Sequence, residues 1–220
     1  MLANNKKVVL ILETLEKGID TLNAPVITLM AKNHHSPYRL LIATLLSLRT
    51  KDETTHVAAS KLFSRAPDPP SLLLMDHKEI ERLIYPVGFY KKKAKLILKI
   101  TRILIEKYGG QVPNDEKTLL NLPGVGRKTA MLILGKAFGV PSICVDTHVH
   151  RISNRLGLVT SKTPEKTEEI LKAIAPKEYW ITLNDHFVAL GQTICRPTSP
   201  KCSICLVAHL CPKINVIRSR

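Results

Sequence analysis

The sequence predicts an all-α fold, and three features of the chain support that prediction. Apolar residues recur with the spacing of an amphipathic helix along most of the 220 residues. No segment shows the strict alternation of polar and apolar residues that is typical of a half-buried strand. Residues that favour helix ends also stand where the apolar periodicity starts and stops, with serine, aspartate or proline before it and glycine after it.

The first expected helices follow Ser36. This serine is a suitable N-cap, and Pro37 is a suitable first helical residue, for the apolar stretch 38–48. Asp52 is the expected N-cap of the next helix. Prolines at positions 67, 69 and 70 then predict a loop, because proline cannot continue a helix from its interior.

The rest of the chain continues the helical pattern. We expect a short helix over residues 76–84 and a long helix over residues 91–108. The long helix should end at Gly109, because glycine readily adopts the left-handed conformation found at helix C-termini. Five further helices complete the prediction: 116–121, 128–138, 147–156, 164–175 and 178–193.

The composition predicts a basic protein with a polyanionic partner. The chain has 33 lysines and arginines against 18 acidic residues, which gives a net charge of +15. Such a surface attracts nucleic acid through phosphate contacts and counterion release, although an acidic membrane would also attract it. The apolar run 8–12 ends at Glu13, so it is too short for an export signal or a membrane span. We therefore expect a cytoplasmic, nucleoid-associated protein without membrane contact.

The segment LPGVGRKTA at residues 122–130 lies between two expected helices and predicts a helix-hairpin-helix motif. Gly124 and Gly126 allow a tight turn and a close approach to a phosphate, and Val125 lies between them. Arg127 and the positive end of the following helix favour the same anion. These residues would bind the DNA backbone without reading its sequence. An ordinary tight turn between two helices is the alternative.

Lys128 follows directly in the first turn of the next helix. The positive end of the helix and the neighbouring Arg127 disfavour its protonated form, so its amine could act as a nucleophile toward a sugar aldehyde. The alternative role is a lysine that only neutralises phosphate.

Asp146 begins the segment DTH at residues 146–148, just before an expected helix. It is a natural N-cap, and a carboxylate in this position could also stabilise a cationic sugar or accept a proton. His148 could contact phosphate, although a structural role is the more common one for a single histidine.

Four of the five cysteines fall within seventeen residues in the pattern C-x6-C-x2-C-x5-C: Cys195, Cys202, Cys205 and Cys211. Four thiolates from one short loop suit a 4Fe-4S cubane, in which each iron needs one sulfur ligand. A structural zinc site is the alternative, although zinc ribbons usually contain two C-x2-C pairs. Disulfides are disfavoured because no export signal is expected. Cys144 lies in an apolar segment and is expected to pack in the core.

LPGVGRKTA, VDTH and the cysteine pattern, in this order and at these separations, closely resemble the endonuclease III family of DNA glycosylases. The likeness covers about residues 30–212. It implies two helical lobes, of which the first is a six-helix, barrel-like domain over residues 28–140 with the hairpin motif at about 116–138. The second lobe would be an iron-sulfur cluster domain made of residues 1–27 and 141–220. The resemblance also implies a 4Fe-4S cofactor and a monomer that binds double-stranded DNA with damaged bases or abasic sites.

By this resemblance, Lys128 corresponds to the catalytic lysine of the family and Asp146 to its catalytic aspartate. The implied activity is that of a bifunctional DNA glycosylase and abasic-site lyase. It would flip out an oxidised pyrimidine, form a Schiff base through Lys128 and cut the strand by β-elimination. A monofunctional mismatch glycosylase for thymine, uracil or adenine is the alternative, but those relatives lack the lysine. A DNA-binding module without enzymatic activity is a third possibility.

Two positions depart from the bacterial pattern of the family. Arg49 stands where many relatives have a glutamine that fills the hole left by the flipped base, and Phe89 stands where a leucine wedge is frequent. Both are expected to contact DNA, Phe89 as an aromatic wedge between base pairs. The alternative for Phe89 is the edge of the core, with the adjoining lysines 91–93 forming a solvated face.

Overall fold

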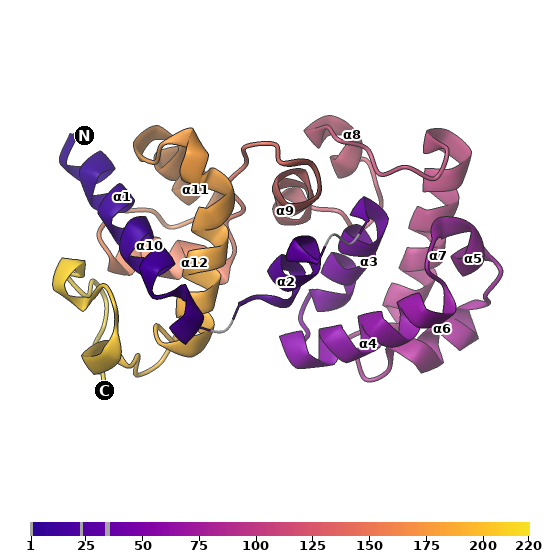
Figure 1. The fold of residues 1–220 in the computed structure, drawn as a ribbon, viewed down its shortest axis with the longest axis horizontal. Coiled ribbons are helices and arrows are strands. Elements are labelled where there is room, and N and C mark those ends of the chain that lie inside the picture. The colour runs from indigo at the N-terminus through magenta and orange to yellow at the C-terminus, as the bar shows by residue number, and fades with distance from the viewer. Residues whose placement is uncertain (1, 23, 34–35) are drawn as a thin grey trace. The chain divides into compact units, whose positions relative to one another are not determined.

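The computed structural model describes residues 2–22, 24–33 and 36–220, and all regular elements in these ranges are helices (Figure 1). The all-α prediction is therefore confirmed for the described part of the chain. Two compact units are present: a central unit, Val26–Val140, and a terminal unit that combines Met1–Pro25 with Pro141–Arg220. None of the described helices combines the length and the apolar character needed to cross a bilayer.

The central unit is built around a buried helix, α3. Its apolar residues are almost all buried, and it packs against α4, α7 and α9, while α7 also contacts α5 and α6. The helices of this unit are α2 (Val26–Lys32), α3 (Pro37–Ser47), α4 (Asp52–Arg65), α5 (Pro69–Leu73), α6 (His77–Ile84), α7 (Tyr90–Tyr108), α8 (Glu116–Leu120) and α9 (Arg127–Phe138). Most of the expected helices thus begin and end within two residues of their predicted positions.

Helix caps in the central unit confirm two predictions. Ser36 accepts a hydrogen bond from the amide of Arg39 at 3.3 Å, and Pro37 is the first residue of α3. The long helix α7 ends at Gly109, whose φ of 57° lies in the left-handed region. The start of α3 and the end of α7 are therefore set by residue types that favour helix ends.

Two other predictions in this unit are wrong. Asp52 is the first residue of α4 rather than its cap, and its Oδ2 accepts a hydrogen bond from the amide of Val26 at 3.0 Å. Its carboxylate thereby holds the start of α2, which is far away in the sequence. The prolines at 69 and 70 do not extend the loop: they occupy the first turn of α5, where proline is favourable, after a capping box formed by Asp68 and Ser71.

The terminal unit joins the two ends of the chain in one core. Its helices are α1 (Leu2–Lys17), α10 (Thr147–Arg155), α11 (Pro164–Ile174) and α12 (Trp180–Thr193), with short 3-10 turns at Ile19–Thr21, Lys177–Tyr179, Cys202–Ile204 and Ala208–Leu210. Ile11 and Leu15 of α1 are buried with Ile152 of α10 and Phe187 of α12. Figure 1 shows α1 beside α12 within this unit, and α1 also contacts α11. The N-terminal helix is therefore part of the same core as the cysteine segment.

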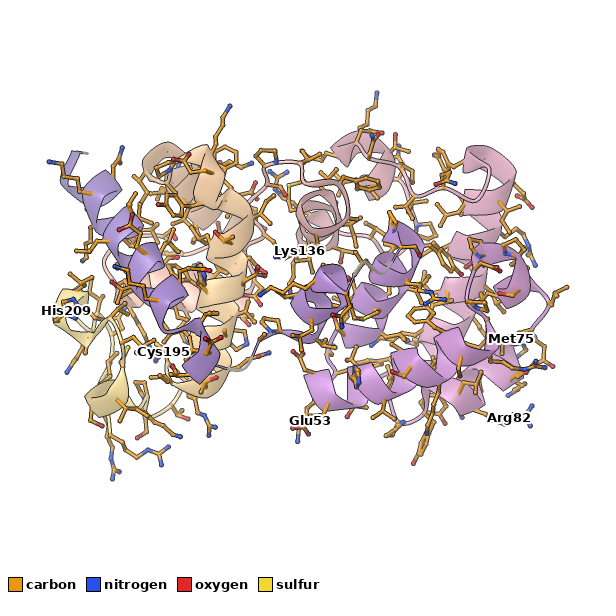
Figure 2. The ribbon with its side chains drawn as sticks, in the orientation of Figure 1. Glu53, Met75, Arg82, Lys136, Cys195 and His209 are labelled. Atoms are coloured by element: carbon orange, nitrogen blue, oxygen red, sulfur yellow. The ribbon has the colours of Figure 1, made fainter. Side chains whose placement is uncertain are left out.

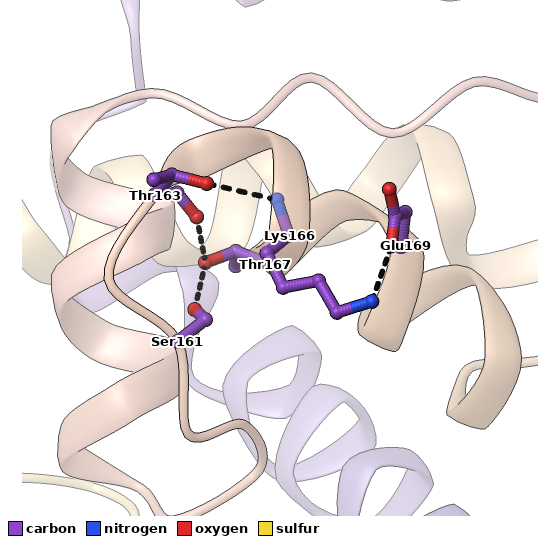
Figure 3. Close-up of polar contacts among 5 residues, drawn as sticks. All are labelled: Ser161, Thr163, Lys166, Thr167 and Glu169. Carbon is purple, nitrogen blue, oxygen red and sulfur yellow. Dashed lines mark hydrogen bonds and ion pairs between the residues drawn. The ribbon is translucent and has the colours of Figure 1, made fainter.

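A local polar network fixes the start of α11 (Figure 3). Thr163 is the N-cap and accepts from the amide of Lys166 at 3.3 Å, and Thr167 donates to the carbonyl of Thr163 at 3.0 Å. Ser161 and Thr167 share a hydrogen bond of 2.5 Å, and Lys166 pairs with Glu169 at 2.6 Å. Short-range contacts thus set the direction in which the chain enters α11.

Candidate functional site

The hairpin between α8 and α9 is formed by backbone contacts over very short distances in the sequence. The amide of Leu122 donates to the carbonyl of Leu119, and that of Val125 donates to the carbonyl of Leu122, both at 3.1 Å. Gly124 has a φ of 73°, and a Cβ on it would stand 2.6 Å from a methyl carbon of Leu96 in α7. The backbone conformation therefore favours glycine at this position, and any larger residue would also force the Leu96 side chain to shift.

The start of α9 is open and basic. Gly126 is the N-cap of α9, and a Cβ placed on it would meet no atom within 4 Å, so there is room for a bound anion. Arg127 pairs with Glu116 of α8 at 2.7 Å, which joins the two helices of the hairpin. Lys128 is exposed in the first turn of α9. The structure thus gathers Gly124, Gly126, Arg127 and Lys128 at one end of α9, as the motif predicts.

Arg49 and Phe89, which lie forty residues apart in the sequence, meet in the central unit. The guanidinium carbon of Arg49 lies 5.7 Å from the centre of the Phe89 ring, a distance typical of a cation–π contact. Both side chains are exposed, Phe89 to 56%, so the alternative of a core position for Phe89 is wrong. Both residues also have a positive φ, 55° for Arg49 and 58° for Phe89. These two residues therefore form one exposed pair on two neighbouring loops.

Lys93, close to this pair in the sequence, departs from the alternative in which lysines 91–93 form a solvated face. The structure confirms that Lys91 and Lys92 are exposed, but the Lys93 residue is only 7% exposed. Its ammonium donates to the carbonyls of Leu46 and Leu48 at 2.8 and 2.6 Å. Burial lowers the pKa of Lys93 from 10.5 to about 8, whereas the oxygen acceptors around it favour the charged form.

A signal for the burial of Lys93 is present in the sequence. Position 93 precedes the buried residues Ile97 and Ile100 by four and seven residues, so it lies on the core face of α7. A lysine at such a position predicts either a snorkelling side chain or a buried cation with specific acceptors.

Asp146 caps α10 in the terminal unit, as predicted. Its Oδ1 accepts from the amides of His148 at 2.8 Å and Val149 at 2.9 Å. The Nδ1 of His148 lies 3.1 Å from a guanidinium nitrogen of Arg151, and its ring lies against Gly191 of α12. His148, a residue of α10, thus packs against α12 of its own unit, which supports a structural role. Lys128 and Asp146 belong to different units.

Two arginines of α10 hold the beginning of the cysteine segment. Arg151 donates to the carbonyl of Cys195 at 2.9 Å. Arg155, which is 8% exposed, donates to the carbonyls of Arg196 at 2.7 Å and Pro197 at 2.6 Å, and its Nη1 lies 3.4 Å from the Sγ of Cys195. The backbone from Cys195 to Pro197 is therefore fixed to the helix that Asp146 caps.

The four clustered cysteines line one pocket in the terminal unit. The pocket has an empty volume of about 420 Å³, open solvent included, and apolar side chains such as Ile152, Leu190 and Val207 also line it. Cys195 and His209 are labelled in this part of Figure 2. Burial raises the pKa of the Cys205 and Cys211 thiols, and the neighbouring cysteine sulfurs raise it further. Bound metal would favour the thiolate forms that burial opposes.

The donor set therefore fits a metal centre with four sulfur ligands. Among the described residues, however, no three cysteines, histidines or carboxylates are grouped in a way that would hold a single metal ion. Cys144, the fifth cysteine, is 2% exposed and belongs to the core, where its carbonyl accepts from Asn184 at 2.9 Å. Packing is thus confirmed as the role of Cys144.

Comparisons with known proteins agree with these features. A model of the HhH-GPD superfamily of base excision DNA repair proteins matches residues 42–177. The chain is 45% identical over 195 residues to endonuclease III of Thermotoga maritima, covering 88% of this chain and 92% of that protein. It also superposes on a trapped endonuclease III–DNA covalent intermediate with a TM-score of 0.83 and 35% identity, covering 95% of this chain and 96% of the other. A thermostable thymine-DNA glycosylase gives a TM-score of 0.81 and 26% identity, covering 96% and 98%.

Proposed function

The chain belongs to the endonuclease III family within the HhH-GPD superfamily of base excision DNA repair proteins, and from this premise we propose its function. It is a bifunctional DNA glycosylase and abasic-site lyase that excises oxidised pyrimidines from duplex DNA. The observation that carries the proposal is the exposed Lys128 in the first turn of α9, directly after the hairpin. A monofunctional mismatch glycosylase needs no such amine, so the lysine favours the bifunctional activity.

The hairpin would hold the DNA backbone. Its open glycine turn and the N-terminal end of α9 offer backbone amides and a positive dipole end to a phosphate, and Arg127 adds a charge. These contacts fix position and carry no sequence information, which suits an enzyme that must act at a lesion in any sequence. Lys128 would then lie beside the sugar that belongs to the bound phosphate.

Lys128 would carry the covalent chemistry. Once the damaged nucleotide is outside the stack, the neutral Nζ attacks C1′, and the N-glycosidic bond breaks with its electron pair going to the base, which takes up a proton. The sugar ring opens to give a Schiff base between C1′ and Nζ. Loss of a proton from C2′ then expels the 3′ phosphate oxygen by β-elimination, and water releases the lysine from the product.

Asp146 would act on the same reaction through its charge. A carboxylate can stabilise the cationic sugar that forms as the base departs, or it can accept a proton. The hydrogen bonds from two backbone amides to Oδ1 hold the side chain in one orientation, which reduces the reorganisation needed during the reaction.

We infer that Cys195, Cys202, Cys205 and Cys211 hold a 4Fe-4S cluster. The segment contains only one C-x2-C pair, whereas zinc ribbons usually contain two. A cubane takes one sulfur at each of four irons, and the four cysteines that line one pocket can supply these ligands. When bound, the cluster would supply structural order to the segment around Arg196 and Lys201, which carries positive charge for phosphate contacts.

The cluster assignment has a direct chemical test. Protein purified without air should contain iron and acid-labile sulfide in equal amounts and show broad visible absorbance. Stoichiometric zinc in place of iron and sulfide would overturn the assignment.

A strand-scission assay tests the proposed function. Wild-type protein is incubated with an end-labelled duplex that contains one thymine glycol, and the products are separated with and without alkali. We expect scission at the lesion without alkali, because base release and β-elimination proceed through the same Schiff base. Strands that break only after alkali would instead support the monofunctional alternative. Binding without any processing of the lesion would support a DNA-binding module.

The role of Asp146 is tested by Asp146→Asn. Asparagine caps a helix about as well as aspartate, so α10 should keep its stability while the rate of base release falls about tenfold or more. Asp76→Asn is the matched control, because Asp76 makes the same kind of cap contact, at 2.8 Å, at the start of α6. Equal rates of base release for the two variants would show that Asp146 acts only as a helix cap.

A further inference from the structure

The loops that carry Arg49 and Phe89, residues 48–51 and 85–89, have backbone conformations that need external support. Arg49 and Phe89 have φ values of 55° and 58°, and neither is glycine. A non-glycine residue in the left-handed region costs on the order of 1 kcal/mol, so such conformations persist only when neighbouring contacts enforce them. The contact between the two exposed side chains is too weak to fix both loops by itself.

The ammonium of Lys93 supplies contacts on the inner side of both loops. It donates to the carbonyl of Leu46 in the last turn of α3, to that of Leu48 directly before Arg49, and to Thr50 Oγ1 directly after Arg49. The three acceptors are 2.8, 2.6 and 3.2 Å from Nζ. Arg49 is thus flanked on both sides by residues that one buried cation binds.

The second loop is attached to the same group. The amide of Gly88 donates to Thr50 Oγ1 at 3.1 Å, so the hydroxyl that Lys93 binds also binds the residue before Phe89. A Cβ on Gly88 would stand 2.6 Å from the carbonyl oxygen of Arg49, which shows how closely the two backbones approach. On the other side of Phe89, its carbonyl accepts from the backbone amide of Lys93 at 3.0 Å.

We propose that Lys93 is a positioning residue that holds the 48–51 and 85–89 loops as one preorganised unit, so that Arg49 and Phe89 enter the DNA together where a base leaves the stack. This role rests on the proposed function, and it adds a residue that itself does not touch the DNA. Preorganisation matters here because disordered loops would have to be fixed during base extrusion, at the expense of binding energy. We name the contacts of Lys93 Nζ and Thr50 Oγ1 with these loops the Lys93 clamp.

A simpler role for Lys93 is a cap for the carbonyls at the end of α3, since cations favour helix C-termini. The two roles differ in their reach. A cap acts only on the 48–51 loop, whereas the Lys93 clamp also acts on the 85–89 loop through Thr50.

Hydrogen exchange separates these roles without any enzymatic readout. Lys93→Met keeps a chain of similar length and removes the ammonium, and Lys99→Met is the control because Lys99 is an exposed lysine of the same helix. In Lys93→Met we expect amide exchange to rise at least about tenfold in both loops, while the other helices keep their protection. A rise confined to the 48–51 loop, or a rise in neither loop, would overturn the proposal.

Thr50→Val provides a milder variant in case Lys93→Met fails to fold. Valine is close to threonine in shape but has no hydroxyl to join Lys93 with Gly88, while the lysine keeps both carbonyl acceptors. We expect faster exchange in the 85–89 loop, by about threefold or more, with α3 unaffected. Unchanged exchange there would contradict the link through Thr50.

An activity split completes the test. Base release from a duplex with thymine glycol should fall about tenfold or more in Lys93→Met, whereas cleavage of a duplex that already contains an abasic site should fall less than about threefold, because no base is left to extrude. Equal losses on both substrates would assign Lys93 a general structural role and overturn the proposal. If the wild-type protein processes neither substrate, the proposed function fails, while the exchange experiment still decides whether Lys93 joins the loops.

Discussion

The hairpin at residues 119–128 and the paired loops at 48–51 and 85–89 belong to the same unit, yet they reach their shapes by opposite means. The hairpin places a glycine at its left-handed position, and its hydrogen bonds join residues only three apart. The loops place Arg49 and Phe89 at left-handed positions, and the contact that supports them joins Leu48 to Lys93, which is 45 residues away. One region is thus specified locally and the other through the tertiary structure.

The two ways of fixing the backbone match the two roles that we propose for the hairpin and for the 48–51 and 85–89 loops. The hairpin offers backbone amides and Lys128, whose positions follow from a turn that glycine makes without strain. The loops supply the long side chains of Arg49 and Phe89. Glycine at either position would remove a side chain that we propose enters the DNA. Backbone strain at Arg49 and Phe89 is therefore the consequence of needing a side chain at a left-handed position, and Lys93 offsets that strain.

The largest expected effect is loss of the chemistry from the hairpin by Lys128→Ala. Covalent trapping on abasic DNA with borohydride should disappear, and strand cleavage should fall at least about a thousandfold, because no other amine occupies the first turn of α9. The melting temperature should stay the same, since Lys128 is exposed. Lys117→Ala, which removes an exposed lysine of α8, should change cleavage by less than about threefold. Normal trapping by Lys128→Ala would show that the hairpin region does not supply the nucleophile.

The next effect concerns the local character of the hairpin. Gly124→Ala should lower the free energy of unfolding by about 2 kcal/mol, because alanine at a φ of 73° is strained and its Cβ collides with Leu96. Gly126→Ala should cost less than about 1 kcal/mol, since the space around Gly126 is open and its φ is negative. Urea unfolding of both variants measures the difference. Equal losses of unfolding free energy in the two variants would show that the left-handed position of Gly124 does not require glycine.

A pH effect should distinguish the loops from the hairpin. The pKa of Lys93 is lowered from 10.5 to about 8 by burial, so below pH 8 the amine is protonated in both folded and unfolded states. Between pH 8 and 10.5 the unfolded chain binds more protons, and the free energy of unfolding of the wild type should rise relative to Lys93→Met by about 1 to 3 kcal/mol. Urea titrations of both proteins at pH 7 and pH 10 give this difference. A pH-independent difference would mean that Lys93 titrates alike in both states.

The smallest expected change in stability comes from Phe89→Gly. Glycine relieves the strain at a φ of 58°, which offsets the lost contact with Arg49 and the larger entropy of the unfolded chain, so the free energy of unfolding should change by less than about 1 kcal/mol. Base release should nevertheless fall about tenfold, because the aromatic wedge is gone. Calorimetry and the thymine-glycol assay measure the two quantities. A large loss of stability would show that the ring, and not Lys93, supports the loop.

Features fixed by neighbours in the sequence were predictable, and the reason is physical. The N-caps at Ser36 and Asp146 and the stop at Gly109 each depend on groups within a few residues. The hairpin could be predicted for the same reason. The sulfur-lined pocket followed from cysteine spacing, since four ligands in seventeen residues can reach one centre without help from the rest of the fold.

Features that depend on distant partners were not predictable. Asp52 has the chemistry of a cap, but its carboxylate is used by the amide of Val26, and only the packing of α2 against α4 decides between the two. Lys93 lies on the core face of α7, but the choice between a snorkelling side chain and a buried cation depends on carbonyls that the end of α3 brings close. The pairing of Arg49 with Phe89 likewise exists only once both loops are folded.

Mapping the trapped covalent complex tests most directly whether Lys128 supplies the nucleophile. Wild-type protein is reduced with borohydride on a duplex with one abasic site, the DNA is digested to the attached sugar, and the modified peptide is sequenced by mass spectrometry. We expect one adduct, a reduced deoxyribose on the Nζ of Lys128. An adduct on another lysine or on the N-terminal amine would contradict the claim that the first turn of α9 supplies the nucleophile.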